Sequence, residues 1–325
     1  MKQLRAIMNS KLWGRGASAI NPGLVVATVV VFIILSFASP YFLSVYNLMN
    51  VGKALVIVGI AAAGETLVII AGGFDLSIGS TMAAAGMLAA YLLEIGSGVG
   101  PAFSAAILLG ICIGAANGTL IAYFRINPLI ATLAMMAIIR GLAFVISNGH
   151  EIVITNKAWL SLGTGKWVGI PYIVLILIVI YLVFALIMPR TKFGRYVYAI
   201  GSNPRAARLS GVSTKKWQLA IYITCGATAA LAGLILAART GTAMPAAAMG
   251  FELDVITAVI LGGASLKGGR GTILGTAIGL ILLFMINNGL TLAQVPTFWQ
   301  QVVKGFILLA AVLYDEIRSG RSDES

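Results

Sequence analysis

Long apolar runs alternate with short polar segments along almost the whole chain of 325 residues. Runs such as 24–38, 173–188 and 273–286 carry no charged residue, and their lengths approach the roughly 20 residues that span the apolar core of a bilayer. Prolines, asparagines, charged residues and glycine clusters divide the chain into about ten such spans. The spans cover residues 24–39, 53–71, 79–93, 102–124, 128–147, 171–188, 217–239, 252–264, 271–292 and 298–314. The pattern predicts an all-α polytopic membrane protein in which residues 1–325 form a single transmembrane domain.

The composition supports this fold class. Hydrophobic residues make up 59% of the chain and charged residues 10%, with a mean hydropathy of +0.99, whereas a soluble domain carries about 25% charged residues. The formal net charge is +12. The basic residues nevertheless stand between the apolar runs and do not form one patch with exposed aromatic residues, as a nucleic-acid surface requires. The lipid bilayer is therefore the expected partner, and nucleic acid is not.

The positions of the basic residues predict the orientation. Lysine and arginine accumulate in short loops on the cytoplasmic side of a membrane. Seven basic residues lie in the loop 189–216, and gaps of the same parity hold Arg125, Lys267 and Arg270. The segment before the first span is also basic and lacks an Ala-x-Ala cleavage site, so we expect an uncleaved first helix. Both termini are expected on the cytoplasmic side.

Glycine-rich segments interrupt the apolar pattern at 72–80 and at 262–271. They follow the second and the eighth predicted span, so an even number of crossings separates them and both should face the same side of the membrane. Broken helices at corresponding positions mark the substrate core of many transporters. We therefore expect an internal repeat whose two halves run in parallel.

Several charged and polar residues lie at or near membrane depth. Asp75 and Ser77 fall in the first glycine-rich segment, and a carboxylate at this depth is unfavourable unless it is paired or hydrated. Asp75 could cap the helix that follows it, or it could take part in gating or substrate passage. Glu65, Arg140 and Lys304 are further charges inside predicted spans, and the sequence does not fix which of them pair. The candidates for the translocation path or its gate are Glu65, Asp75, Ser77 and Arg140.

Two acidic residues stand at a predicted helix start on the outer side. Glu252 and Asp254 follow the polar segment 240–250. Acidic side chains in the first turn of a helix complement the helix dipole. The same two carboxylates could form a docking surface for a periplasmic protein, and both interpretations stay open at this point.

No metal site or catalytic centre is predicted. The chain has one histidine, His150, and its two cysteines, Cys112 and Cys225, lie in apolar runs. The segment 263–268 has the Gly-x4-Gly spacing of a phosphate-binding loop, but Gly-Arg follows where Lys-Ser/Thr is required. We therefore expect that this chain is not an enzyme and binds no cofactor of its own.

The loop with seven basic residues contains a short capped helix. Asn203 is a good N-cap, Pro204 suits the first helical position, and Gly211 can end the helix in the left-handed conformation. The alternative is a basic loop that lies on anionic lipid headgroups. Headgroup binding needs only charge, whereas this loop also specifies caps and the small residues Ala206 and Ala207, which permit close docking into a protein groove. We predict a protein-docking helix.

The same segment resembles the ribose-type permeases of bacterial ABC importers. Its pattern over 201–211 reads Gly-x-Asn-Pro-x-Ala-Ala-x-x-Ser-Gly. The likeness covers the chain from about residue 24 to residue 314. Further matching motifs follow in order at 72–80 (Gly-Gly-Phe-Asp-Leu-Ser-Ile-Gly-Ser), 127–133 (Asn-Pro-Leu-Ile-Ala-Thr-Leu), 140–141, 251–254 and 261–269. Phe74 and Glu65 depart from the family pattern, in which apolar and mostly aliphatic residues are usual at these places, and both departures concern the substrate path.

The resemblance implies a type II ABC-importer-like permease that moves a ribose-like monosaccharide across the bacterial inner membrane. Its partners would be a second permease chain, identical or similar, a cytoplasmic ATPase that binds ATP and Mg²⁺, and a periplasmic sugar-binding protein. The residues that the resemblance assigns to ATPase coupling are Gly201, Asn203, Pro204, Ala206, Ala207, Ser210 and Gly211. The family spans pentoses, hexoses and autoinducer-2, so the sequence does not select a substrate. The alternative is a gradient-coupled secondary transporter of a small polar solute, which also uses repeats and midplane charges.

Overall fold

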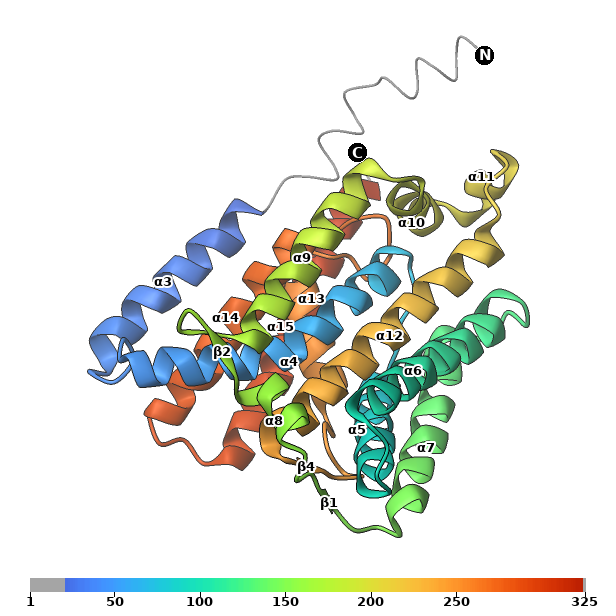
Figure 1. Cartoon of the computed structure of the whole chain (residues 1–325). Coiled ribbons are helices and arrows are strands. Elements are labelled where there is room, and N and C mark those ends of the chain that lie inside the picture. Colours follow the sequence, from blue (N-terminus) through green and yellow to red (C-terminus); the bar gives the residue numbers. More distant parts are fainter. Residues whose placement is uncertain (1–20, 324–325) are drawn as a thin grey trace.

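The computed structural model describes residues 21–323, which form a bundle of helices with four two-residue strands (Figure 1). The basic segment before the first span lies outside the described residues, as do the side chains of Arg318 and Arg321. The helices are α3 (Pro22–Ala38), α4 (Val45–Ile70), α5 (Ile78–Glu94), α6 (Val99–Ala122), α7 (Pro128–Ser147), α8 (Lys157–Thr164), α9 (Tyr172–Arg190), α10 (Lys192–Ser202), α11 (Pro204–Leu209), α12 (Thr214–Thr240), α13 (Phe251–Leu261), α14 (Ile273–Leu292) and α15 (Thr297–Asp323). The strands are β1 (Ile152–Val153), β2 (Lys166–Trp167), β3 (Ile170–Pro171) and β4 (Thr242–Ala243), and β1 pairs with β4 and β2 with β3, both antiparallel.

The all-α polytopic fold is confirmed, although not every one of the about ten predicted spans is a helix of full bilayer length. Each predicted span coincides with a helix, and in the described part of the chain seven helices are long and apolar enough to cross a membrane: α4, α6, α7, α9, α12, α14 and α15. The helices α3 and α5 are apolar but shorter, with 17 residues each. Helix α13 has 11 residues, which at about 1.5 Å per residue cover only about half of an apolar core of about 30 Å.

Capping residues explain where several helices begin. The side chain of Ser44 accepts a hydrogen bond from the backbone N–H of Asn47 at 3.2 Å, and that of Thr272 accepts one from Gly275 at 2.9 Å. Asn21 and Asn127 cap α3 and α7, each of which has proline at the start of the helix. These residues satisfy backbone donors that have no partner within the helix, and proline supplies no such donor.

Helix α12 lies at the centre of the bundle and packs most extensively against α6, α4 and α5 (Figure 1). Glycines permit the contact with α6. A side chain at Gly114 would collide with the backbone of Tyr222, and one at Gly226 would collide with the backbone of Gly110. Close approach of small residues is the usual way in which helices associate inside a membrane, where lipid provides no hydrophobic driving force between them.

The polar segments gather at two opposite ends of the bundle. One end, called the α11 end here, holds α10 and α11, the end of α4, the turn between α6 and α7, and the loop 262–271. The other, called the β end, holds α8 and the paired strands β1 and β4. All loops that the sequence assigns to the cytoplasmic side lie at the α11 end, while α8 with Lys157 lies at the β end. The relative sidedness of the loops therefore agrees with the prediction.

The helix pairs α4–α5 and α12–α13 run in opposite directions, which is the arrangement of an inverted repeat and not the parallel one expected from the sequence. The two glycine-rich segments do meet at the α11 end, since the backbone N–H of Gly269 donates to the carbonyl of Ile70 at 2.8 Å. They do not, however, occupy equivalent places. Helix α4 runs toward the α11 end and α5 runs back from it, whereas α12 runs away from that end and α13 runs back toward it (Figure 1). The counterpart of segment 72–77 is therefore segment 244–250, which enters the bundle from the β end.

Candidate functional site

The segment 72–77, called the hairpin here, folds back beside α4 before α5 begins. The backbone N–H of Asp75 donates to Glu65 Oε1 at 3.2 Å. Because Glu65 lies six residues before Ala71 at the end of α4, Asp75 lies about 9 Å inside the bundle from that end. Both carboxylates are buried, with exposed fractions of 0% for Glu65 and 2% for Asp75.

Asp75 organises the start of α5. Its Oδ1 atom accepts hydrogen bonds from the backbone N–H of Ser77 at 2.9 Å and from Ser77 Oγ. Asn117 Nδ2 on α6 donates to both oxygens of Asp75 at 3.3 Å and to Ser77 Oγ at 2.9 Å. Ser77 is the N-cap residue of α5 but makes no side-chain capping bond. Asp75 therefore accepts hydrogen bonds from both donors of Ser77, the residue that precedes α5, and its bonds with Asn117 hold the hairpin on α6.

Two residues of α12 complete this polar group. Cys225 Sγ lies 3.5 Å from Glu65 Oε2 and donates to it, and the hydroxyl of Tyr222 donates to the carbonyl of Phe74 at 3.2 Å. We call Glu65, Asp75, Ser77, Asn117 and Cys225 the hairpin cluster. Its members come from α4, the hairpin, α6 and α12, so a change in the packing of any of these elements would reach the start of α5.

The segment 244–250, called the re-entrant segment here, is held by Arg140. The Arg140 Nη1 atom on α7 donates to the carbonyls of Pro245 at 2.8 Å and Ala247 at 2.7 Å. Arg140 lies seven residues before the end of α7 at Ser147. A guanidinium group has donors in a fixed planar arrangement, so it can bind two carbonyls of a non-helical backbone that would otherwise lack partners at membrane depth.

The two short helices α5 and α13 meet at their N-termini. A side chain at Gly79 would collide with Glu252 Oε2 and with the carbonyl of Ala248. Glu252 Oε1 accepts a hydrogen bond from the backbone N–H of Gly250 at 3.2 Å. The Asp254 carboxylate is buried and forms an ion pair with Lys304 of α15 at 2.8 Å. Asp254 thus has a structural partner inside the chain, while Glu252 is the more accessible of the two.

The predicted translocation residues lie in two groups. Glu65 and Ser77, both 0% exposed, belong to the hairpin cluster together with Asp75. Arg140 on α7 is half-buried and binds the re-entrant segment. Lys304 pairs with Asp254. The pairing that the sequence leaves open is therefore an ion pair between α13 and α15, and neither Glu65 nor Arg140 takes part in it.

A close backbone contact, called the junction here, joins α10 to both glycine-rich segments. A side chain at Gly201 would collide with the carbonyl of Ile70, and one at Gly268 would approach the backbone of Gly72 to 3.0 Å. Gly268 and Gly269 have φ angles of +82° and +74°, a conformation that glycine adopts without steric penalty. The C-terminal end of α10, directly before α11, therefore touches the end of α4 and the loop after α13 at one place.

Side chains at the α11 end secure the junction. The hydroxyl of Tyr198 on α10 donates to the carbonyl of Gly271 at 2.8 Å. Burial raises the pKa of Tyr198 to about 12, so the phenol stays protonated and remains a donor at neutral pH. Asp315 Oδ2 on α15 accepts from Ser265 Oγ at 3.1 Å and from the backbone N–H of Leu266 at 2.9 Å. These bonds fix the loop 262–271 against α10 and α15.

Helix α11 has the caps that the sequence predicts. Asn203 Oδ1 accepts from the backbone N–H groups of Arg205 and Ala206 at 3.0 and 2.9 Å. Gly211 follows the helix with a φ angle of +84°, and the backbone N–H of Val212 donates to the carbonyl of Ala207 at 3.0 Å, which closes the C-terminal turn. The helix is six residues long and ends at Leu209, two residues before Gly211.

The two alanines of α11 have different surroundings. Ala207 is buried, with an exposed fraction of 5%, and faces this chain. Ala206 is exposed, and Leu209 is 85% exposed. All residues of α11 other than Ala207 are exposed, and so are Ser210 and Gly211, which follow the helix.

Several residues of these groups were missed by reasoning from the sequence. Asn117, Tyr222, Asp315 and Leu209 were not singled out, and Cys225 was interpreted only as a small buried apolar residue. Asn117 gave a usable signal, because it is a lone amide within the apolar stretch of α6. The partners of the others come from distant parts of the chain, which residue patterns do not bring together.

No group of three or more His, Cys, Asp or Glu side chains that could hold a metal ion occurs among the described residues. The hairpin cluster contains two carboxylates and one thiol, and the oxygen Asn117 Oδ1 has no hydrogen-bond partner. The Cys225 thiol donates to the Glu65 carboxylate, and both groups are closed off from solvent inside the chain. The cluster joins four elements and holds the hairpin backbone in place.

Comparisons with known proteins indicate the family of the chain. A family model described as "Branched-chain amino acid transport system / permease component" matches residues 47–312. The ribose import permease protein RbsC of Escherichia coli K12 is 42% identical over 294 residues, which cover 89% of this chain and 92% of that protein. RbsC of Bacillus subtilis 168 is 41% identical over 296 residues, with coverages of 89% and 91%.

The L-arabinose transport system permease protein AraH of Escherichia coli K12 is 38% identical over 296 residues, which cover 91% of this chain and 90% of that protein. No solved structure matches the chain. The family match covers well over half of the chain, and the three relatives match it over about nine-tenths of its length. The chain therefore belongs to the family of transport-system permease components, and it is a multi-pass membrane protein.

Proposed function

We propose that this chain is the membrane permease subunit of an ATP-binding-cassette importer for a ribose-like monosaccharide in the bacterial inner membrane. The description of the family names branched-chain amino acids. The relatives that match over about nine-tenths of the chain are instead named ribose and L-arabinose permeases. This supports a sugar over an amino acid as substrate, and a pentose in particular.

Energy would come from a separate cytoplasmic ATPase that binds ATP and Mg²⁺. The observation that carries this proposal is the junction at Gly201. There the segment that leads into α11 touches both the carbonyl of Ile70 at the end of α4 and the backbone of Gly269 in the loop after α13. A partner that moves α11 would therefore pull on both halves of the inverted repeat at once.

The α11 end would face the cytoplasm, with both termini on that side. This orientation follows from the seven basic residues of the loop 189–216 and from Arg125 in the turn between α6 and α7. A periplasmic sugar-binding protein would then dock at the β end. A second permease chain, most simply an identical copy, would complete the translocation path, because the described chain encloses its own polar residues in the hairpin cluster.

The hairpin cluster would act as the inner part of the gate without lining the path. Glu65, Asp75 and Ser77 are inside the chain, so a sugar does not touch them in this conformation. Asp75 fixes the start of α5, which meets the start of α13 at Gly79 and Glu252. Movement of the hairpin would thus reach the re-entrant segment, where Arg140 and Glu252 are accessible from the β end.

The exposed surface of α11 gives a sharp test of the coupling role. Ala206→Glu places a charge on the outward surface, whereas Ala207 faces this chain. In proteoliposomes with the ATPase and the binding protein, Ala206→Glu and Leu209→Asp should abolish ATPase association and reduce ATP-driven ribose uptake at least about tenfold. Their thermal unfolding should be unchanged, because neither side chain packs in the chain.

The matched control is Ser213→Ala, which changes an exposed residue just after α11 that makes no side-chain capping bond and is not among the coupling residues. It should leave association and uptake as in the unmodified protein. If Ala206→Glu and Leu209→Asp retain full ATPase association and full uptake, α11 is not the coupling helix.

A gradient-coupled secondary transporter is the second candidate, and two observations favour it. Inverted repeats with broken helices are common in that class, and the carboxylates of Glu65 and Asp75 are buried together without a basic partner among the interactions of the described chain. This candidate predicts uptake by the chain alone, driven by a proton or sodium gradient and reduced by Glu65→Gln. The importer predicts no uptake in liposomes that lack the ATPase, whatever gradient is imposed.

A further inference from the structure

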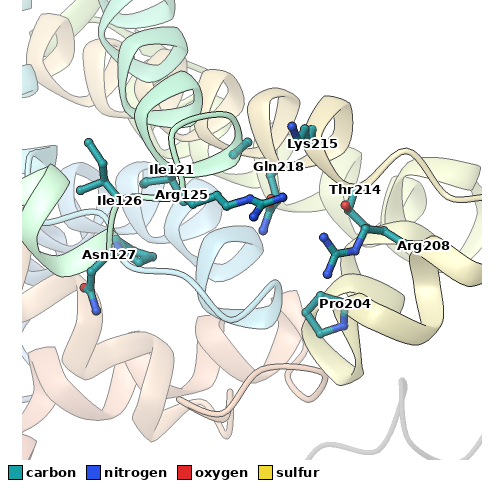
Figure 2. A pocket seen from close by; sticks show the side chains of 11 residues that line it. Ile121, Arg125, Ile126, Asn127, Pro204, Arg208, Thr214, Lys215 and Gln218 are labelled. Atoms are coloured by element: carbon teal, nitrogen blue, oxygen red, sulfur yellow. The ribbon is translucent and has the colours of Figure 1, made fainter.

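A cavity of about 430 Å³ lies at the α11 end, between the turn after α6, helix α11 and the start of α12 (Figure 2). Its volume falls within the range of about 300–1,000 Å³ that is usual for ligand pockets. Arg125 comes from the turn, Arg208 from α11 and Lys215 from α12. No acidic residue is among those that line it.

The three cations define the chemistry of this cavity. Figure 2 shows Arg125 and Arg208 extending from opposite walls toward the space between them. Neither of the two salt bridges of the described chain involves any of these cations. Lys215 Nζ lies 5.4 Å from the centre of the Tyr123 ring, which helps to hold this ammonium group at the wall. Cations gathered in this way attract an anion, and arginine in particular matches the oxygens of a phosphate group.

The backbone around Arg125 closes the C-terminal turn of α6. Arg125 has a φ angle of +60°, and the backbone N–H of Ile126 donates to the carbonyl of Leu120 at 3.2 Å. Asn127 caps α7 with a hydrogen bond to the backbone N–H of Leu129 at 2.9 Å and also lines the cavity. These bonds fix the turn that carries Arg125 between α6 and α7.

The apolar part of the cavity identifies the type of anion. Ile121 and Ile126 line it beside the cations. In the same turn, Tyr123 is 47% exposed and Phe124 is 70% exposed. The turn lies where the membrane-spanning helix α6 ends and α7 begins. Aromatic residues at such a place occupy the headgroup level of a bilayer. An acidic loop of a protein partner would need the cations but not the apolar wall and the exposed aromatic rings.

We propose that this cavity binds the phosphate of an anionic phospholipid in the cytoplasmic leaflet. Arg125, Arg208 and Lys215 would hold the phosphate, while the lipid tails would follow the apolar surface at Ile126 and Phe124. Basic pockets between membrane helices on the cytoplasmic side are suited to such headgroups. The bound lipid would link α11 to the α6–α7 turn and so fix the docking helix. The leaflet rests on the orientation given under the proposed function, but binding does not depend on import.

The test uses the full chain alone in detergent, with native mass spectrometry of retained phosphatidylglycerol and phosphatidylcholine. The unmodified chain should retain phosphatidylglycerol in preference. Each charge removed should lower that retention about fivefold, so Arg125→Gln with Arg208→Gln should lower it about 25-fold. The matched control is Arg195→Gln with Lys216→Gln, two exposed cations near the same end that do not line the cavity. It should retain the lipid as the unmodified chain does.

Other occupants give other results. Equal loss in the cavity variant and in the control would show a general charge effect and overturn the proposal. A free-anion site would reveal itself if millimolar inorganic phosphate displaced all retained lipid. An ATPase contact would be shown by two results together. The cavity variant would keep phosphatidylglycerol in the mass-spectrometric measurement, and it would lose ATPase association in nanodiscs of pure phosphatidylcholine. Because the lipid measurement contains no ATPase and no sugar, its failure would leave the importer proposal unaffected.

Discussion

The starts of α5 and α13 are equivalent in the inverted repeat but differ in how they are held. The start of α5 is fixed by Asp75, Ser77 and Asn117, which are all buried. The start of α13 follows the re-entrant segment, in which Met249 is 67% exposed. A further cavity of about 230 Å³, with mostly apolar walls, separates part of this segment from α5 and α12.

We infer from this difference that one half of the repeat is locked and the other is free to adjust. The polar atoms that fix the start of α5 are hydrogen-bonded except for Asn117 Oδ1, and buried networks of this kind favour one arrangement, whereas exposed backbone with few buried contacts opens easily. The hairpin should therefore control stability, and the re-entrant segment should control transport. Substitutions that are matched between the two segments can test this division.

Asp75→Ala should have the largest effect. It removes the acceptor of the Ser77 N–H and Oγ groups and of Asn117 Nδ2, all of which are buried. Leaving several buried donors without partners should lower the free energy of unfolding by about 3 kcal/mol or more. Thermal unfolding monitored by size-exclusion chromatography in detergent measures this loss, and transport should fall with the amount of folded protein.

Asp75→Asn is the control for charge at the same position. Its amide oxygen can still accept from Ser77, so most of the stability should remain. Should this variant fold normally but lose transport, the charge of Asp75 has a role in gating beyond holding α5. If Asp75→Ala unfolds no more easily than the unmodified protein, the hairpin is not the locked half.

Arg140→Ala should cause the second-largest loss of stability and the largest loss of transport. It leaves the carbonyls of Pro245 and Ala247 without their donor, which should destabilise the chain by about 2 kcal/mol. Hydrogen exchange should rise in 244–250 and stay unchanged in the hairpin. Uptake per folded molecule should fall, and Arg140→Lys should recover it only in part because an ammonium group cannot present the same planar pair of donors. Equal exchange in both segments would contradict the proposed division.

Lys304→Met should have a smaller effect. It removes the partner of Asp254, whose carboxylate is mostly buried, while Lys304 itself is partly exposed. Because Lys304 is partly exposed, the free energy of unfolding should fall by only about 1 kcal/mol. Adding Asp254→Asn removes the unpaired charge and should restore part of the stability, which a double-mutant cycle measures. No recovery in the double variant would mean that Lys304 stabilises the start of α13 in some other way.

Much of the fold follows from the sequence because its signals are local. Apolar length predicts each helix, the break before residue 128 predicts where α7 begins, and the cap Asn203 predicts where α11 begins. The direction of the repeat could not be predicted in the same way. Sequence breaks at glycine mark both true half-helix starts and ordinary end turns, and only the packing shows that 262–271 is an end turn while 244–250 enters the bundle.

The site was predictable where a single charged residue stands within an apolar stretch of sequence. Asp75 and Arg140 are charges within apolar patterns, and both hold non-helical backbone in place. Their partners were not predictable. Arg140 binds carbonyls 105 and 107 residues away, and carbonyls are present at every residue. The inward direction of Ala207 likewise depends on how α11 packs on α12, which its pattern of small residues leaves undetermined.

Glu252→Gln should have the smallest effect on stability, and for that reason it separates the two halves best. Glu252 is half-buried and its Oε1 atom accepts from the backbone N–H of Gly250, a bond that the amide oxygen of glutamine can replace. The free energy of unfolding should change by less than about 0.5 kcal/mol. Uptake and the affinity for the binding protein should be measured together, because a docking role predicts weaker binding at low ionic strength and a path role predicts slower uptake with binding unchanged. A loss of stability larger than that of Asp75→Asn would mean that the start of α13 is as firmly held as the start of α5, and the division between a locked half and an adjustable half would then fail.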